Sequence, residues 1–145
     1  VEALNYDLGS IRKLLNNQDS EIRFFQLFAS WMRFLYKRDI IKIVDWNEKI
    51  SSVGRKNQIE FCNYSIKIIR ECLIYKISIK TNTIIEIEEK EFIKNFSPYL
   101  NEEKILHIVN KLEKTIYAVG RNANSKILFF NLSLECLKLL TLKSN

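Results

Sequence analysis

The C-terminal stretch, residues 125–140, constrains the fold most, because it predicts a helix with very little polar surface. Its clearest polar line is Asn131, Glu135 and Lys138, which are spaced as neighbours on one side of a helix. Apolar residues occupy most of the remaining circumference: Ile127, Leu128, Phe129, Phe130, Leu132, Leu134, Cys136, Leu137, Leu139 and Leu140. A helix that is apolar nearly all round is buried on several sides. We therefore expect it to be the central helix of the domain, enclosed by other helices or by a partner chain.

Helix-start signals and a scarcity of turn residues predict an all-α fold. Asn122, Asn124 and Ser125 can accept hydrogen bonds from the unpaired N–H groups where the last helix begins. The chain of 145 residues has 3 Gly and 1 Pro, too few for a β-sandwich rich in turns. We expect a single antiparallel bundle of about six or seven helices joined by short loops.

Five further segments predict helices from their apolar periodicity. They are residues 19–37, 39–53, 55–78, 88–96 and 101–120. Asp39 and Asn101 are suited to cap the helices that they precede, and Gly54 suits the left-handed residue at a helix end. Trp31 and Trp46 fall on apolar positions of their helices, which favours burial in the core over the alternative of an interface anchor.

Two stretches interrupt this helical pattern. Residues 1–16 predict a short helical segment and the polar residues 16–20 predict a linker, so we divide the chain into 1–16 and a helical domain, 17–145. Residues 79–87 lose the helical period and are rich in isoleucine and threonine, which favour extended backbone. We favour an irregular loop there, with a short hairpin as the alternative.

The net charge of +6 permits contact with nucleic acid or with an acidic membrane surface. Because the charges are spread along the chain, a lysine-rich solvated surface is the favoured interpretation. Lys37, Arg38, Arg55 and Lys56 lie at predicted helix junctions, where cations either complement helix C-termini or contact phosphate. No aromatic residue is clearly presented beside them, so the sequence does not predict base stacking on single strands.

No motif predicts an enzyme. His107, the single histidine, lies among lysines on a polar helix face, which favours a solvated side chain over a metal ligand or a base. Glu86, Glu88, Glu89 and Glu91 fit an acidic loop beside lysines better than an acid–base pair. The sequence has no cysteines at metal-binding spacing and no glycine-rich phosphate loop. We therefore expect no catalytic residue, no metal, no cofactor and no small-molecule substrate.

Cys62, Cys72 and Cys136 lie within helical patterns, where a free cysteine behaves as a small apolar residue. Their odd number and their spacing predict buried thiols in a reducing cytoplasm rather than a disulfide framework. No apolar run approaches the roughly 18 residues of a membrane span, and no signal peptide is visible. We expect a cytoplasmic protein without a membrane partner.

Four stretches resemble the C-terminal collar domain of the delta-prime subunit of the bacterial DNA polymerase III clamp loader. They are residues 24–33, 46–58, 92–99 and 121–133. In the last of them, Asn-x-Asn followed by a leucine-rich helix is similar to the final collar helix of clamp-loader subunits generally. Residues 1–16 resemble the end of an AAA+ lid. Leu14 replaces the small residue usual there, so we assign Arg12 no nucleotide role.

The resemblance implies a non-catalytic domain that packs with the collar domains of other clamp-loader subunits into a ring. That ring holds the ATPase modules that load the sliding clamp onto DNA in replication, so DNA contact by this domain is expected to be indirect or weak. The rival interpretation is a stand-alone basic helical domain that binds nucleic acid through Lys/Arg patches. An enzyme with an unfamiliar site is a third interpretation.

Residue chemistry predicts where such a domain would meet its neighbours. The last helix has more apolar circumference than one domain easily covers, and the residues around its start are polar enough to pair with another chain. The predicted interface residues are Arg121, Asn122, Asn124, Lys126, Asn131, Glu135 and Lys138. The alternative is that helices of this domain bury the whole helix and leave residues 121–126 as a local cap.

Overall fold

The computed structural model describes the backbone of residues 8–78 and 87–141, with side chains from residue 23 onward in those ranges. The elements are α1 (Leu8–Lys37), α2 (Ile40–Ser51), α3 (Arg55–Ser78), α4 (Ile87–Phe96), the short 3-10 helix η2 (Ser97–Tyr99), α5 (Glu102–Gly120) and α6 (Ser125–Thr141). No strand occurs among the described residues, so the predicted all-α bundle is confirmed. The predicted loop or hairpin lies outside them, apart from Ile87, which begins α4.

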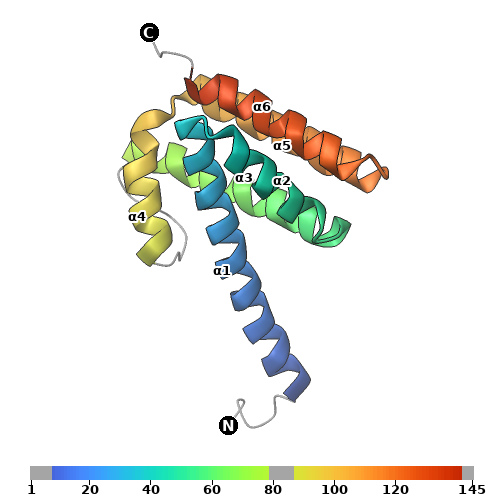
Figure 1. Cartoon of the computed structure of the whole chain (residues 1–145). Coiled ribbons are helices and arrows are strands. Elements are labelled where there is room, and N and C mark those ends of the chain that lie inside the picture. The colour runs from blue at the N-terminus through green and yellow to red at the C-terminus, as the bar shows by residue number, and fades with distance from the viewer. Residues whose placement is uncertain (1–7, 79–86, 142–145) are drawn as a thin grey trace.

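Four helices lie roughly along one direction, and two cross them. Figure 1 shows α2, α3, α5 and α6 side by side, with α5 and α6 antiparallel and α1 and α4 crossing the layer. α3 packs against α5, α4, α1 and η2, whereas α6 packs against α5, α2 and α1. The chain therefore folds as one bundle in which helices distant in sequence share a core.

Helix α1 continues through residues 16–20, where the sequence predicts a linker. It has 30 residues, which corresponds to about 45 Å of helix, and its N-terminal half extends beyond the rest of the bundle (Figure 1). The polar residues of that stretch include neither Gly nor Pro, and each costs only about 0.7 kcal/mol or less in a helix relative to alanine. A helix that is anchored downstream can therefore extend through them.

The helix ends follow the predicted cap chemistry. Asp39, Asn101 and Asn124 each accept a hydrogen bond from the backbone N–H three residues later, at 3.2, 2.7 and 3.2 Å. Gly54, between α2 and α3, has φ +88°, a left-handed conformation that costs glycine no steric clash. These local signals explain why the sequence places the starts of α2, α3, α5 and α6 correctly.

Within this chain the most enclosed helix is α3, so the expectation that helices of this domain enclose the last helix is wrong. The fully buried apolar side chains of α3 are Phe61, Cys62, Ile68, Ile69 and Cys72. In α6, buried residues such as Phe129 and Cys136 occupy one side, while Ile127 on the outer side is 62% exposed. An apolar circumference shows what a helix could bury, but the path of the chain decides how many neighbours cover it.

Two stacked tryptophans join four helices. The rings of Trp31 and Trp46 lie 4.8 Å apart with an interplanar angle of 4°, and Phe61 packs against both. The indole N–H of Trp31 donates to Ser133 Oγ at 2.9 Å, and that of Trp46 donates to the Leu27 carbonyl at 3.0 Å. Both indoles are buried and hydrogen-bonded, which confirms the predicted core role and ties α1, α2, α3 and α6 together.

Candidate interaction surfaces

The turn that leads into α6 is held by contacts within the chain. The guanidinium of Arg121 lies over the ring of Tyr117, with 4.7 Å from its carbon to the ring centroid. Asn122 adopts a left-handed conformation with φ +67°, and the Asn124 carboxamide caps α6. Three of the predicted interface residues therefore shape the α5–α6 turn, and all three remain exposed.

The first turn of α6 is joined to α2 and α3. Lys126 Nζ lies 3.3 Å from Glu48 Oε2, and the Lys126 carbonyl accepts a 3.0 Å hydrogen bond from the side-chain amide of Asn47. Ser125 Oγ donates to Gln58 Oε1 at 3.0 Å. The charged groups of the ion pair are more than half exposed, so their attraction contributes at most about 1 kcal/mol. The pair marks a point where α2 and α6 meet and stays accessible to solvent.

The polar line of α6 faces solvent. Asn131 and Lys138 are exposed and Glu135 is half-buried, with Lys138 Nζ 3.8 Å from Glu135 Oε1. The structure thus places these three predicted interface residues on the outer side of α6, away from the buried side that carries Phe129. That placement is compatible with a rim around a contact surface.

Apolar side chains lie between this polar line and α2. α2 and α6 are packed against each other and run in opposite directions (Figure 1). Glu48, Val44 and Ile40 succeed one another at four-residue intervals along α2, and Lys126, Phe130 and Leu134 do so along α6. Because Glu48 meets Lys126 and the helices are antiparallel (Figure 1), we infer from this spacing that Val44 lies near Phe130 and Ile40 near Leu134.

We name this region the α2–α6 surface. It comprises Ile40, Ile41, Val44, Ile127, Phe130 and Leu134. Ile41 is 77% exposed. Phe130 and Leu134 are only half-buried, and neither is among the partly buried side chains that pack against the core. Apolar side chains that stay accessible on two packed helices, with polar residues around them, are typical of protein–protein contact sites.

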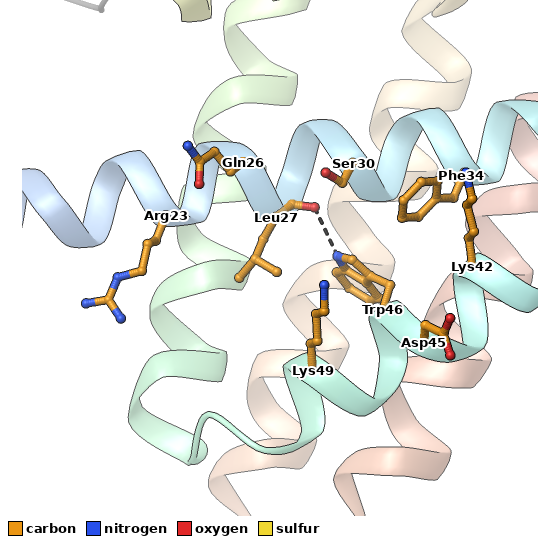
Figure 2. A pocket seen from close by; sticks show the side chains of 9 residues that line it. All are labelled: Arg23, Gln26, Leu27, Ser30, Phe34, Lys42, Asp45, Trp46 and Lys49. Atoms are coloured by element: carbon orange, nitrogen blue, oxygen red, sulfur yellow. Dashed lines mark hydrogen bonds between the residues drawn. The ribbon is translucent and has the colours of Figure 1, made fainter.

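A second surface is the groove between α1 and α2, shown in Figure 2. It has a volume of about 480 Å³. It is lined by Arg23, Gln26, Leu27, Ser30 and Phe34 of α1 and by Lys42, Asp45, Trp46 and Lys49 of α2. Polar residues recur at helical spacing along one side of α1 (Arg23, Gln26, Ser30) and along one side of α2 (Lys42, Asp45, Lys49). The sequence does not reveal that these two sides face each other.

The four cations predicted to contact phosphate are not brought together. Lys37 and Arg38 are exposed at the α1–α2 junction, and Arg55 and Lys56 are exposed at the start of α3. Helix α2, with 12 residues and therefore about 18 Å of length, lies between the two pairs. The two pairs would have to act as separate contacts.

The buried cysteines are inert at neutral pH. Cys62, Cys72 and Cys136 are free thiols and all are buried, as predicted. Burial raises the pKa of Cys62 and of Cys136 to about 12 and that of Cys72 to about 11. Because the thiolate is the reactive form, these thiols act as packing groups.

Two ionisable residues that the sequence places near solvent are buried. Lys104 of α5, one of the lysines around His107 on the helix face that the sequence predicts to be polar, is buried. Glu89 lies in α4, in agreement with the predicted helix 88–96 and not with an acidic loop, and its Oε2 accepts a 2.7 Å hydrogen bond from the Tyr64 hydroxyl. Hydrogen bonding offsets the cost of removing a carboxylate from water. No local pattern signals such long-range partners.

The remaining candidate features in the described part of the chain are His107, a metal site and a membrane-spanning helix. His107 is exposed, and its Nε2 lies 4.0 Å from Glu103 Oε1. No group of three or more His, Cys, Asp or Glu in residues 23–78 and 87–141 could hold a metal ion. Within the described ranges, no helix combines the length and the apolar character needed to cross a bilayer.

No protein-family model, no curated protein and no solved structure matches the chain.

Proposed function

We propose that this chain is a non-catalytic assembly domain that joins other subunits of a complex through the α2–α6 surface. The complex we propose is a clamp loader of the DNA polymerase III type, in which the chain is the collar domain of the delta-prime subunit. It would then act in the cytoplasm, in DNA replication, without touching ATP or a cofactor itself. The choice of complex rests on the resemblance of residues 121–133 and the other three stretches.

The observation that carries the proposal is the incomplete burial of α6. Burying apolar surface contributes about 25 cal/mol per Å², so a domain gains by covering Ile127, Phe130 and Leu134. Here they remain exposed or half-buried beside Ile40 and Ile41 of α2. A partner helix laid along this surface would supply the missing neighbours. We infer that α6 is completed by another chain.

The polar residues around the α2–α6 surface would form its rim. Asn131 and Lys138 flank the apolar side chains on α6, and the Lys126–Glu48 pair closes the end next to α2. Rim charges contribute mainly to the association rate and to the choice of partner. Arg121 lies one turn of chain before α6 and would extend the same rim.

Two exposed isoleucines allow a test that does not disturb the core. Ile127→Arg and Ile41→Arg place a charge on the surface, and Leu106→Arg on α5, where the leucine is 60% exposed, is the matched control. We expect each isoleucine variant to weaken association with the co-expressed clamp-loader subunits by at least about tenfold, because a charge would be buried without a partner. Size-exclusion chromatography and calorimetry measure this. Unchanged association in both variants, or an equal loss in the control, would refute the proposal.

A second candidate function is favoured by the cations of the α1–α2 groove. Arg23, Lys42 and Lys49 lie on one side of the molecule and could contact the phosphates of nucleic acid. Nonspecific binding of this kind has dissociation constants of roughly 10⁻⁴–10⁻⁶ M at physiological salt. Fluorescence anisotropy with duplex DNA over a range of salt concentrations tests it. Tight binding that distinguishes sequences would replace the assembly proposal with this one.

A further inference from the structure

We propose that the α1–α2 groove binds an acidic amphipathic helix of a partner protein. The apolar side chains of that helix would lie on the floor of the groove, and its carboxylates would meet the cations of the rim. This contact goes beyond the assembly surface, because the groove lies on the other side of α2. Lys42, Asp45 and Lys49 face it, whereas the α2–α6 surface uses Ile40 and Val44.

The floor of the groove is apolar. It is formed by Leu27 and Phe34, which are half-buried, and by the edge of Trp46 (Figure 2). Trp46 is 2% exposed and its indole N–H already donates to the Leu27 carbonyl at 3.0 Å, so Leu27 and Phe34 supply the apolar surface that a ligand can reach. A ligand gains from this floor by burying apolar groups against it.

The rim of the groove is cationic. Arg23, Lys42 and Lys49 are exposed around it, and Asp45 is the carboxylate that faces it. Among the described residues, no carboxylate lies within 4 Å of these three cations, which therefore remain available to an acidic ligand. Lys42 is held in place over the Phe34 ring, with its Nζ 5.6 Å from the centroid. Gln26 and Ser30 add neutral hydrogen-bonding groups on the α1 side.

The combination of floor and rim favours a protein segment over nucleic acid. Bases bound to single strands stack on exposed aromatic faces. Trp46 is 2% exposed and stacked on Trp31, and Lys42 lies over one face of the half-buried Phe34 ring, so a base would have to displace Lys42 to stack there. A phosphodiester backbone would use the rim but gain nothing from the floor. An acidic segment with apolar side chains uses both.

The dimensions of the groove fit a short helix. The lining residues of α1 extend from Arg23 to Phe34, which is about 16 Å along the helix axis. Three turns of an α-helix span the same distance, and a helix laid in a groove contacts it through residues spaced i, i+3, i+4 and i+7. The volume of about 480 Å³ lies in the usual range of ligand sites, roughly 300–1,000 Å³.

The test uses the whole chain and a fluorescein-labelled synthetic peptide. The peptide carries leucines at i, i+3, i+4 and i+7 and glutamates on both flanks. Three matched probes are a peptide with glutamine in place of glutamate, a peptide with serine in place of leucine, and a labelled random-sequence duplex DNA. We expect saturable binding of the acidic leucine peptide, and binding at least about tenfold weaker for the other two peptides.

Charge reversal locates the contact. The double variant Lys42→Glu, Lys49→Glu should weaken binding of the acidic peptide by at least about tenfold, because like charges then face each other. The control variant Lys94→Glu, Lys114→Glu changes the net charge equally at exposed positions of α4 and α5 and should change affinity less than about twofold. Thermal melting confirms that each variant is folded.

Nuclear magnetic resonance of the unaltered chain provides an independent readout. The indole N–H of Trp46 lies at the groove, and that of Trp31 is bonded to Ser133 in the core, so the peptide should shift the first signal more than the second. Ile127→Arg should bind the peptide normally, which separates this proposal from the assembly proposal. Equal binding of the glutamine peptide, equal loss in the control variant, or no binding would overturn the inference. Competition by duplex DNA at the same residues would reassign the groove to nucleic acid.

Discussion

Helices α3 and α6 differ both in how apolar they are and in how far other helices surround them. α6 is the more apolar of the two, yet its outer side, which carries Ile127, stays exposed, while α3 carries more charged residues and is the most enclosed helix described. α3 has neighbours on several sides because α1, α4, α5 and η2 all cross or flank it. The comparison shows that a helix with more apolar surface than its neighbours cover marks a contact surface of the molecule and not the centre of its core.

Truncating one aromatic residue on each helix should show the largest difference between them. Phe61→Ala on α3 should cost about 3–5 kcal/mol of unfolding free energy, because a fully buried ring that packs on Trp31 and Trp46 leaves a cavity. Phe130→Ala on α6 should cost less than about 1.5 kcal/mol, because its ring is only partly buried. Urea denaturation monitored by circular dichroism measures both. Equal costs would show that α6 is as enclosed as α3.

The inner side of α6 should respond differently from its outer side. Ser133→Ala removes the acceptor of the Trp31 indole N–H, which is fully buried, and should cost about 1–3 kcal/mol. Ser52→Ala is the control, because the Ser52 hydroxyl is exposed and bonds locally to the Lys49 carbonyl. Its cost should stay within about 0.5 kcal/mol. If the two serine variants had equal stability, the α1–α6 hydrogen bond would contribute nothing.

The thiol of Cys136 tests the same side of α6 through pH. Its pKa is raised by burial from 9.0 to about 12, so the unfolded chain releases a proton above pH 9 that the folded chain retains. The stabilisation is therefore complete below pH 9 and is lost as pH rises from 9 toward 12. When the pH is raised from 8 to 10, the unfolding free energy of the unaltered chain should fall by up to about 1.4 kcal/mol more than that of Cys136→Ala.

Denaturation at the two pH values provides the measurement, and thiol labelling provides the control. A disulfide reagent at pH 8 should modify the native chain only as fast as the chain opens, because Cys62, Cys72 and Cys136 are all buried. Immediate labelling of the folded chain that is abolished in Cys136→Ala would place Cys136 on the outer side of α6 and would reverse the comparison.

Features that depend on neighbouring residues in the chain were predictable. The caps at Asp39, Asn101 and Asn124 each use a backbone N–H three residues away, and Gly54 carries its own backbone preference. The expected bounds of α3, residues 55–78, coincide with the observed Arg55–Ser78. Burial of the tryptophans and cysteines followed from helical spacing of apolar residues. Local hydrogen bonds and periodicity thus account for the correct part of the fold.

Features that depend on the path of the chain were not predictable. Trp31 and Ser133 are 102 residues apart, and no local signal pairs them. The same holds for the buried hydrogen bond that the Tyr64 hydroxyl donates to the Glu89 carboxylate. The α1–α2 groove arises because two polar lines, each visible in sequence, face each other across a helix crossing. Of the predicted sites, the structure gathers the α6 residues around one end and one side of a helix, and it separates the four junction cations.

The sequence by itself determined that this protein is helical, where most helices begin, and which side of each helix is apolar. Those properties arise from backbone caps, from residue preferences and from the 3.6-residue turn, all of which act within a few residues. Only the tertiary structure decided that α3 is enclosed, that α6 keeps an open flank beside α2, and that Arg23, Lys42 and Lys49 meet around one groove. Coverage by neighbours is a long-range property, because it depends on how distant segments cross.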